Sequence, residues 1–162
     1  MEDLQLRLLE PETDLDLFRL AFSWRTPKKH LSGPQMSFEA FSETNPTHLT
    51  IGLFNGELLA VYFLREYDPA RYEAHFTSKK GVPRDVLLQG ARAVINLLLD
   101  NGAAEICALV LAANCPLRRF ATDLGMKREC VIKFSSCAEM IQESSIQTRN
   151  QRGFFIKYAT RA

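Results

Sequence analysis

The stretch YEAHFTSKKGVPRDVLLQGARAVINLLLDNGAAEICALVL, residues 72–111, decides the fold of this chain. Residues 72–77 at its start have the pattern of a strand, and the apolar run of residues 105–111 at its end is typical of a central strand covered on both faces. Between them, apolar side chains recur at helical spacing from Arg84 to Asp100, which predicts an amphipathic helix that stops at Asn101-Gly102. We therefore expect two parallel strands that lie side by side and are joined through a helix.

Antiparallel strands precede this stretch. The apolar runs of residues 48–54 and 57–64 are separated by Asn55-Gly56, a pair that supplies the positive φ angles of a type I′ turn and so predicts a hairpin. The strand at residues 72–77 then adds to this hairpin as a third antiparallel strand. Near the start of the chain, the alternation from Leu4 to Leu8 predicts one more strand.

A helix and a loop are predicted between these strands. Residues 12–24 have apolar side chains at mostly helical spacing, with Thr13 as the N-cap. The segment Arg25 to Pro34 is basic and rich in residues that break helices and strands, so it predicts a loop that is a candidate lid. Residues 37–43 predict one or two helical turns before Asn45-Pro46.

After the buried strand, residues 114–124 predict a helix that ends at Gly125. Residues 127–134 and 153–159 predict two more strands. The polar segment 135–150 between them suggests only a helical turn at residues 138–142. The complete order predicts an α/β (α+β) fold with a mixed, mostly antiparallel twisted sheet flanked by helices.

Length and charge limit the classes of function. A chain of 162 residues, 46% of them hydrophobic, predicts a single domain over residues 1–162. Twenty Lys and Arg against nineteen Asp and Glu give a net charge of +1, so we expect no nucleic-acid partner. No apolar run approaches the roughly 18 residues that a membrane span needs, and the first residues do not resemble a signal peptide. We therefore expect a cytoplasmic protein without a membrane partner.

The cysteines do not predict a metal site. They stand at positions 107, 115, 130 and 137, without a Cys-x-x-Cys pair or a histidine at ligand spacing. Cys107 lies within an apolar run, where a free thiol is usually a small buried hydrophobic side chain.

A basic loop offers a phosphate site. Ser78 to Arg84 joins a strand to a helix, and a helix N-terminus presents unpaired N–H groups and the positive end of the helix dipole. Lys79, Lys80 and Arg84 add cationic side chains, and Gly81 lies between them. The loop therefore predicts a pyrophosphate site, although a solvated basic turn has the same sequence features.

Two side chains of the strand before this loop can carry acid–base chemistry. Glu73 and His75 are two residues apart, so they point to the same face of the sheet and can jointly hold a proton-accepting water. A surface ion pair of either residue with Lys or Arg is the structural alternative.

The chain resembles the GCN5-related N-acetyltransferase superfamily. The residues Tyr72-Glu-Ala-His-Phe76 are similar to the fourth strand of that family, in the Glu-x-His version of members encoded by tailed phages. Ser78 to Arg84 stands where the family has its acetyl-CoA pyrophosphate loop. Asn114-Cys-Pro-Leu-Arg-Arg119, followed by Leu124-Gly-Met126, resembles the branch that acetylates the N-termini of ribosomal proteins.

This resemblance implies an acetyl-CoA-dependent N-acetyltransferase that acts on a primary amine of a protein N-terminus, a lysine or a small molecule. It implies Glu73 and His75 as catalytic residues, and Trp24 and Arg25, after the first helix, as acceptor-binding residues. The family's tyrosine acid is replaced by Ala121. The cofactor-binding residues that it implies are Phe76, Thr77, Lys79, Lys80, Gly81, Arg84, Asn114, Arg118 and Arg119. Asn114 is equally suited to N-cap the helix that follows it.

A catalytically silent protein of the same fold is the alternative. The loop departs from the family's pattern, because Ser78 and Pro83 fill two of its signature positions and Asp85 brings a carboxylate close to the phosphates. Such a protein binds a protein partner, for example as a virion or assembly component. Either version is compatible with a monomer or a homodimer.

Overall fold

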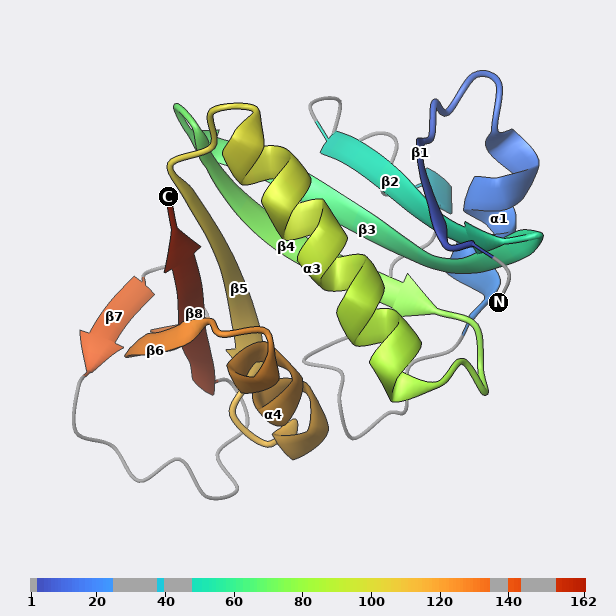
Figure 1. The fold of residues 1–162 in the computed structure, drawn as a ribbon. Helices are drawn as coiled ribbons and strands as arrows, with labels where there is room; N and C mark the ends of the chain where they lie inside the picture. Colours follow the sequence, from blue (N-terminus) through green and yellow to red (C-terminus); the bar gives the residue numbers. More distant parts are fainter. Residues whose placement is uncertain (1–2, 25–37, 40–47, 135–139, 144–153) are drawn as a thin grey trace.

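The computed structural model describes residues 3–24, 38–39, 48–134, 140–143 and 154–162, and its strands form one sheet in the order β1-β2-β3-β4-β5-β8-β6-β7 (Figure 1). Within the described sheet, β4 and β5 pair in parallel and all other neighbours pair antiparallel. The strands are β1 (Gln5–Leu8), β2 (His48–Asn55), β3 (Glu57–Asp68), β4 (Arg71–Ser78), β5 (Glu105–Leu111), β6 (Lys127–Phe134), β7 (Met140–Glu143) and β8 (Phe154–Arg161). The helices are α1 (Leu15–Ser23), α3 (Arg84–Asp100) and α4 (Cys115–Asp123). The predicted mixed, mostly antiparallel α/β fold is confirmed.

Helices cover both faces of the sheet. Helix α3 crosses the front of the sheet in Figure 1, and α4 lies on the same side at the end of β5. Buried side chains of α3, among them Ala91 and Val94, pack with Tyr62 and Leu64 of β3. On the opposite face, Phe18 of α1 packs with β3 side chains of the other parity. Strand β3 is therefore buried from both sides, and it anchors the two layers.

Gly90 brings α3 close to the sheet. A Cβ atom at this position would lie 2.6 Å from Leu53 Cδ2 and 2.7 Å from Tyr62 Oη, closer than real Cβ contacts. Leu53 is almost completely buried, so it has little room to move. The absence of a side chain at Gly90 therefore sets the height of α3 above β2 and β3.

Several sequence predictions need correction at the ends of elements. The hairpin is present, but its turn is not type I′, because Gly56 has a positive φ and Asn55 does not. The register of the two strands also shifts at Leu53/Phe54. Helix α1 begins at Leu15 with Asp14, not Thr13, at the N-cap. The Asp14 carboxylate instead accepts hydrogen bonds from the backbone N–H of Glu10 and from Arg7, which ties the helix start to β1.

The largest correction concerns the segment before the last strand. A helical turn was predicted at residues 138–142, but residues 140–143 form β7, which pairs antiparallel with β6. Cross-strand bonding to β6 overrides the weak local pattern of this polar segment. The loop predicted at residues 25–34 lies outside the described residues, and so do most of the helical turns predicted at residues 37–43.

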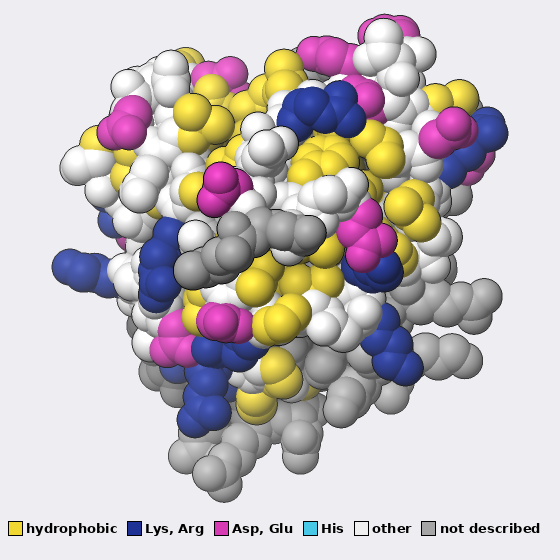
Figure 2. Space-filling model, turned by 45° about the vertical axis from the view of Figure 1, so that its right-hand side comes forward, with side chains coloured by type: hydrophobic (Ala, Val, Ile, Leu, Met, Phe, Trp, Pro, Cys, Tyr) yellow, Lys and Arg dark blue, Asp and Glu magenta, His cyan; other side chains and the backbone are white. Residues whose placement is uncertain are grey.

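The distribution of charged side chains on the surface agrees with the balanced net charge of the sequence (Figure 2). On the face shown in Figure 2, positive and negative side chains are interspersed and do not separate by sign. Among the described helices, none combines the length and the apolar character that crossing a membrane requires.

We expect Gly90→Ala to destabilise the protein by about 1–3 kcal/mol, because the overpacking of a buried contact outweighs the gain of about 1 kcal/mol in helix propensity. Denaturant unfolding measures the change. The exposed Ala93 on the same helix is the control, since Ala93→Gly should lose only about 1 kcal/mol of helix propensity. A stabilised Gly90→Ala variant would show that α3 does not depend on this close approach.

Candidate functional site

Strands β4 and β5 separate after three paired positions. Their parallel register joins Arg71 to Glu105, Tyr72 to Ile106 and Glu73 to Cys107, and it goes no further. Beyond that point, within the described part of the chain, β4 pairs only with β3 and β5 pairs only with β8. Residues 74–78 and 108–111 thus form a fork whose inner edges do not bond each other, as the diverging ribbons of Figure 1 show.

Glu73 lies at the closed end of this fork and is held by two partners. One carboxylate oxygen is 2.8 Å from Nε2 of His75, and the other accepts a hydrogen bond from the Arg65 guanidinium. Glu73 is buried, whereas about half of the His75 side chain is exposed. The prediction that Glu73 and His75 share a face of the sheet is correct, and they contact each other directly.

The charges around Glu73 keep it ionised. The hydrogen bond from His75, reinforced by the Arg65 guanidinium and opposed by burial, lowers the pKa of Glu73 to about 2. A carboxylate of this acidity is a poor proton acceptor near neutral pH. The carboxylate therefore orients the His75 ring: because an ionised carboxylate only accepts hydrogen bonds, Nε2 of His75 donates to it.

The predicted phosphate loop presents fewer free cations than its sequence suggests. Gly81 has a φ of +88°, which forms the turn before α3. Lys79 bonds both carboxylate oxygens of Glu57 at 2.8 Å, and so points back to the β2–β3 hairpin. Lys80 is exposed at the turn. The N-cap of α3, Pro83, makes no side-chain hydrogen bond, so the first N–H groups of the helix face outward.

Arg84, the first residue of α3, is bound to α4. Its guanidinium forms an ion pair with Asp123, and its Cζ atom lies 5.9 Å from the centre of the Phe120 ring. Arg92 reaches the same helix end, where it donates to the backbone carbonyl of Asp123 at 2.8 Å. Arg84 therefore joins α3 to α4, and a phosphate could bind its guanidinium in place of Asp123.

The three residues of the Asn-Arg-Arg motif lie in different environments. Asn114 is buried and caps α4, because its Oδ1 accepts a hydrogen bond from the backbone N–H of Leu117 at 3.2 Å. Arg118 donates to the carbonyl of Ala112 at 3.2 Å, while its buried Nε has no hydrogen-bond partner among the residues that the structure describes. Arg119 is exposed. Thus the capping role of Asn114 is present, and Arg118 packs under the same helix end.

The remaining predicted site residues lie in three places. Phe76 stacks between Tyr62 and Phe120, with ring centres 5.9 and 5.1 Å apart, so it belongs to the wall of the fork. Thr77, half-buried, is opposite Val61 in the β3–β4 register. Trp24 ends α1 and packs against the core on the Glu73 face. Arg25 lies outside the described residues.

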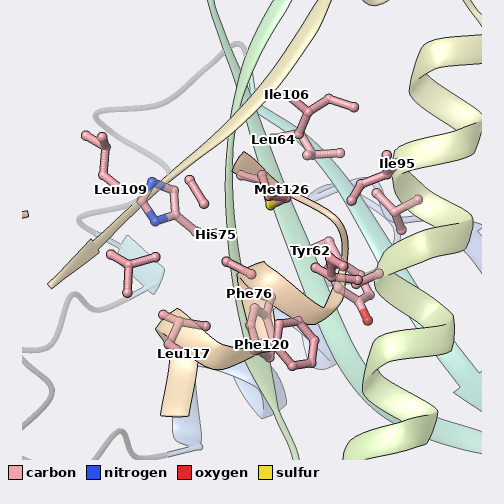
Figure 3. A pocket seen from close by; sticks show the side chains of 17 residues that line it. Tyr62, Leu64, His75, Phe76, Ile95, Ile106, Leu109, Leu117, Phe120 and Met126 are labelled. Atoms are coloured by element: carbon pink, nitrogen blue, oxygen red, sulfur yellow. The ribbon is translucent and has the colours of Figure 1, made fainter. Parts of the chain in front are cut away.

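A cavity of about 150 Å³ lies beneath the fork, between the sheet and helices α3 and α4 (Figure 3). Side chains from β3, β4, β5 and both helices ring it. His75 and Leu109 line it from the two arms of the fork, and Ile95 of α3 lies across from them (Figure 3).

Sequence reasoning missed a second polar cluster beside Glu73. Glu105 is buried and accepts hydrogen bonds from the Tyr67 hydroxyl and from Lys157 and Arg161 of β8. Burial would raise the pKa of Glu105, but these hydrogen bonds outweigh it and hold the pKa below its usual value. Burial raises the pKa of the neighbouring Cys107 thiol. The sequence signal that could have indicated this cluster is the glutamate at the first position of an otherwise apolar strand.

Solved acetyltransferase structures share this fold. A Bacillus subtilis acetyltransferase in complex with CoA matches with a TM-score of 0.71 and 16% identity, over 99% of each chain. The ribosomal-protein-S18-alanine N-acetyltransferase of Escherichia coli matches with a TM-score of 0.67 and 15% identity, over 98% of this chain and 94% of that chain. No protein-family model matches the sequence, and no curated protein matches it either. The chain is thus similar to acetyltransferases along its whole length in fold.

Glu73 should contribute to stability in a way that depends on pH. Because folding lowers its pKa to about 2, its contribution is complete above the ordinary glutamate value and is lost as the pH falls towards 2. We expect the free energy of unfolding of the wild type to fall by about 2 kcal/mol relative to Glu73→Gln between pH 5 and pH 2. The exposed Glu12→Gln is the control, and its difference from wild type should stay constant. A constant difference for Glu73→Gln would contradict the assigned ionisation.

Proposed function

We propose that this chain, which has the fold of the GCN5-related N-acetyltransferases, moves an acetyl group from acetyl-CoA to a primary amine. The amine belongs to a protein N-terminus, a lysine or a small molecule. The observation that carries this proposal is the Glu73–His75 pair at the closed end of the β4–β5 fork. It puts an oriented imidazole at the point where an acyl group held between the two strands would end.

The residues of the fork fit coenzyme A. Its pantetheine arm contains amides, and the inner backbone edges of residues 74–78 and 108–111 supply donors and acceptors that bind an extended chain in the manner of an added strand. At the open end, the N-terminus of α3 with Lys80 and Arg84 suits a pyrophosphate. Phe76, Thr77, Gly81, Asn114, Arg118 and Arg119 are the further contacts that we propose.

The chemistry is a transfer from sulfur to nitrogen. A bound acetyl-CoA supplies an activated thioester. The amine attacks the thioester carbonyl carbon as the neutral free base, and His75 Nδ1 takes up the proton that its nitrogen loses as the C–N bond forms. The new C–N bond forms as the C–S bond breaks, and the thiolate that leaves takes up a proton from water. Glu73 holds His75 and stabilises the imidazolium. The amine approaches from the α1 face, where Trp24 and Arg25 are proposed acceptor contacts.

A silent scaffold is the second candidate, and a specific observation favours it. Lys79 and Arg84, two of the three cations of the loop, are already paired with Glu57 and Asp123. Pyrophosphate would have to displace Asp123 to reach Arg84. Titration with CoA separates the two readings: binding at micromolar concentration supports the enzyme, and no binding at millimolar concentration supports a protein-binding role.

His75→Gln should lower kcat by about 10- to 1,000-fold and leave CoA affinity within about twofold, because the imidazole acts on the amine. Steady-state rates and calorimetry measure the two effects. The rise of the wild-type rate with pH, expected of a histidine base, should also disappear in the variant. Arg71→Gln, an exposed position on the same face of β4, is the control for local packing. Full activity of a folded His75→Gln variant would contradict the assigned role.

Arg84→Ala should weaken CoA binding by about ten- to 100-fold, since a charged hydrogen bond to phosphate is lost. Lys80→Ala should have a smaller effect of the same sign, and both should reduce the dependence of affinity on salt. Arg92→Ala, on the same helix but two turns from its N-terminus, is the matched control. Equal affinities in Arg84→Ala, Lys80→Ala and wild type would mean that the phosphates bind elsewhere.

A further inference from the structure

The cavity beneath the fork is lined almost entirely by hydrocarbon. Tyr62 contributes a hydroxyl, but that group donates to the Leu87 carbonyl at 3.2 Å. His75 stands at the rim with its Nε2 on Glu73. Alanine side chains from four elements leave the space open: Ala74, Ala91, Ala108 and Ala121. Apart from His75, no side chain of this lining offers a free polar group to the amides of a pantetheine arm, which leaves the backbone edges of the fork as their partners.

Polar and apolar parts of an acyl-CoA should therefore separate in this site. A buried amide without a hydrogen-bond partner costs several kcal/mol, so the arm belongs on the unpaired backbone edges of the fork. A hydrocarbon loses nothing in the cavity and gains by leaving water. His75 and Leu109, on the two arms of the fork, both line the cavity (Figure 3), and a thioester must stand beside His75 for the amine to react.

The size of the cavity also exceeds what acetyl requires. An apolar cavity of about 150 Å³ is known to admit a molecule as large as benzene, which has six carbon atoms. An acetyl group adds a single methyl beyond its carbonyl. The cavity of this chain has the same volume, about 150 Å³, so acetyl would leave most of it empty.

We infer that the cavity is an acyl-chain pocket, which admits acyl groups of about four to six carbons in addition to acetyl. This inference rests on the proposed function, since it requires that a CoA thioester lies in the fork. It extends the donor from acetyl-CoA to short-chain acyl-CoA. Ala91 and Ile95 of α3, which line the cavity away from the fork, set the length limit.

Calorimetric titration with CoA, acetyl-CoA, butanoyl-CoA, hexanoyl-CoA and decanoyl-CoA tests the inference without knowledge of the amine. Each methylene up to hexanoyl should tighten binding by about two- to fourfold, as expected for burial of a CH₂ group. Decanoyl-CoA should bind no more tightly than hexanoyl-CoA, because its chain is longer than the cavity.

Variants of α3 locate the acyl chain. Ala91→Leu fills the cavity, and it should weaken hexanoyl-CoA at least tenfold while leaving free CoA within twofold. Ile95→Ala enlarges it and should move the tightest binding to a longer chain. Leu99→Ala, on the same helix and outside the cavity lining, should change none of these affinities. Should Ala91→Leu fail to fold, Ala108→Val on β5 fills the same space.

The outcomes separate this inference from the proposed function. Equal affinity for acetyl-, butanoyl- and hexanoyl-CoA, with free CoA bound, would overturn the acyl pocket alone. An equal loss of free CoA and hexanoyl-CoA in Ala91→Leu would show that the arm itself fills the cavity, and would overturn it too. Absence of binding for free CoA would overturn the proposed function, and the acyl pocket with it.

Discussion

The site depends on one constraint, which is that β4 and β5 can bond each other over only three positions. Each strand is held on its other edge, β4 by β3 and β5 by β8, and the twist of the sheet carries them apart beyond Glu73. Buried backbone N–H and C=O groups require partners, and among the described residues the inner edges of the fork do not pair with each other. The cavity, the imidazole and the start of α3 all adjoin this opening.

The two faces of the sheet at the fork differ in chemistry because side chains alternate along β4. Ala74 and Phe76 face α3 and α4 and line a hydrocarbon space. Glu73 and His75 face the α1 side, where Arg65 pairs with Glu73, and the cluster around Glu105 lies beside them. The hydrogen bond from His75 and the charge and hydrogen bond of Arg65 hold the Glu73 carboxylate in place and lower its pKa. The Glu73–His75 pair and the apolar side chains of Ala74 and Phe76 therefore lie on opposite sides of one strand.

Sequence patterns predicted the architecture well where burial decides it. The bounds of α3 and β5 agree with the predicted residues 84–100 and 105–111, because long apolar periodicities leave one arrangement that buries them. They failed at residues 140–143, where pairing with β6 decides and local preference is weak. At the site, the spacing of Glu73 and His75 correctly predicted that their side chains lie on one face of the sheet. The partners of Lys79 and Arg84 could not be predicted, since Glu57 and Asp123 are distant in sequence and reach them only through the fold.

The ion pair of Arg84 with Asp123 has a consequence for how fast a ligand comes and goes. A guanidinium whose charge is cancelled by a neighbouring carboxylate attracts a distant anion weakly, so diffusion towards the fork gains little electrostatic acceleration. Once an anion has displaced Asp123, that carboxylate remains tethered at the end of α4 and competes for the same arginine at a high effective concentration. Asp123 would therefore shorten the residence time of an anion bound to Arg84. In an acetyltransferase, this would favour rapid release of free CoA after the transfer.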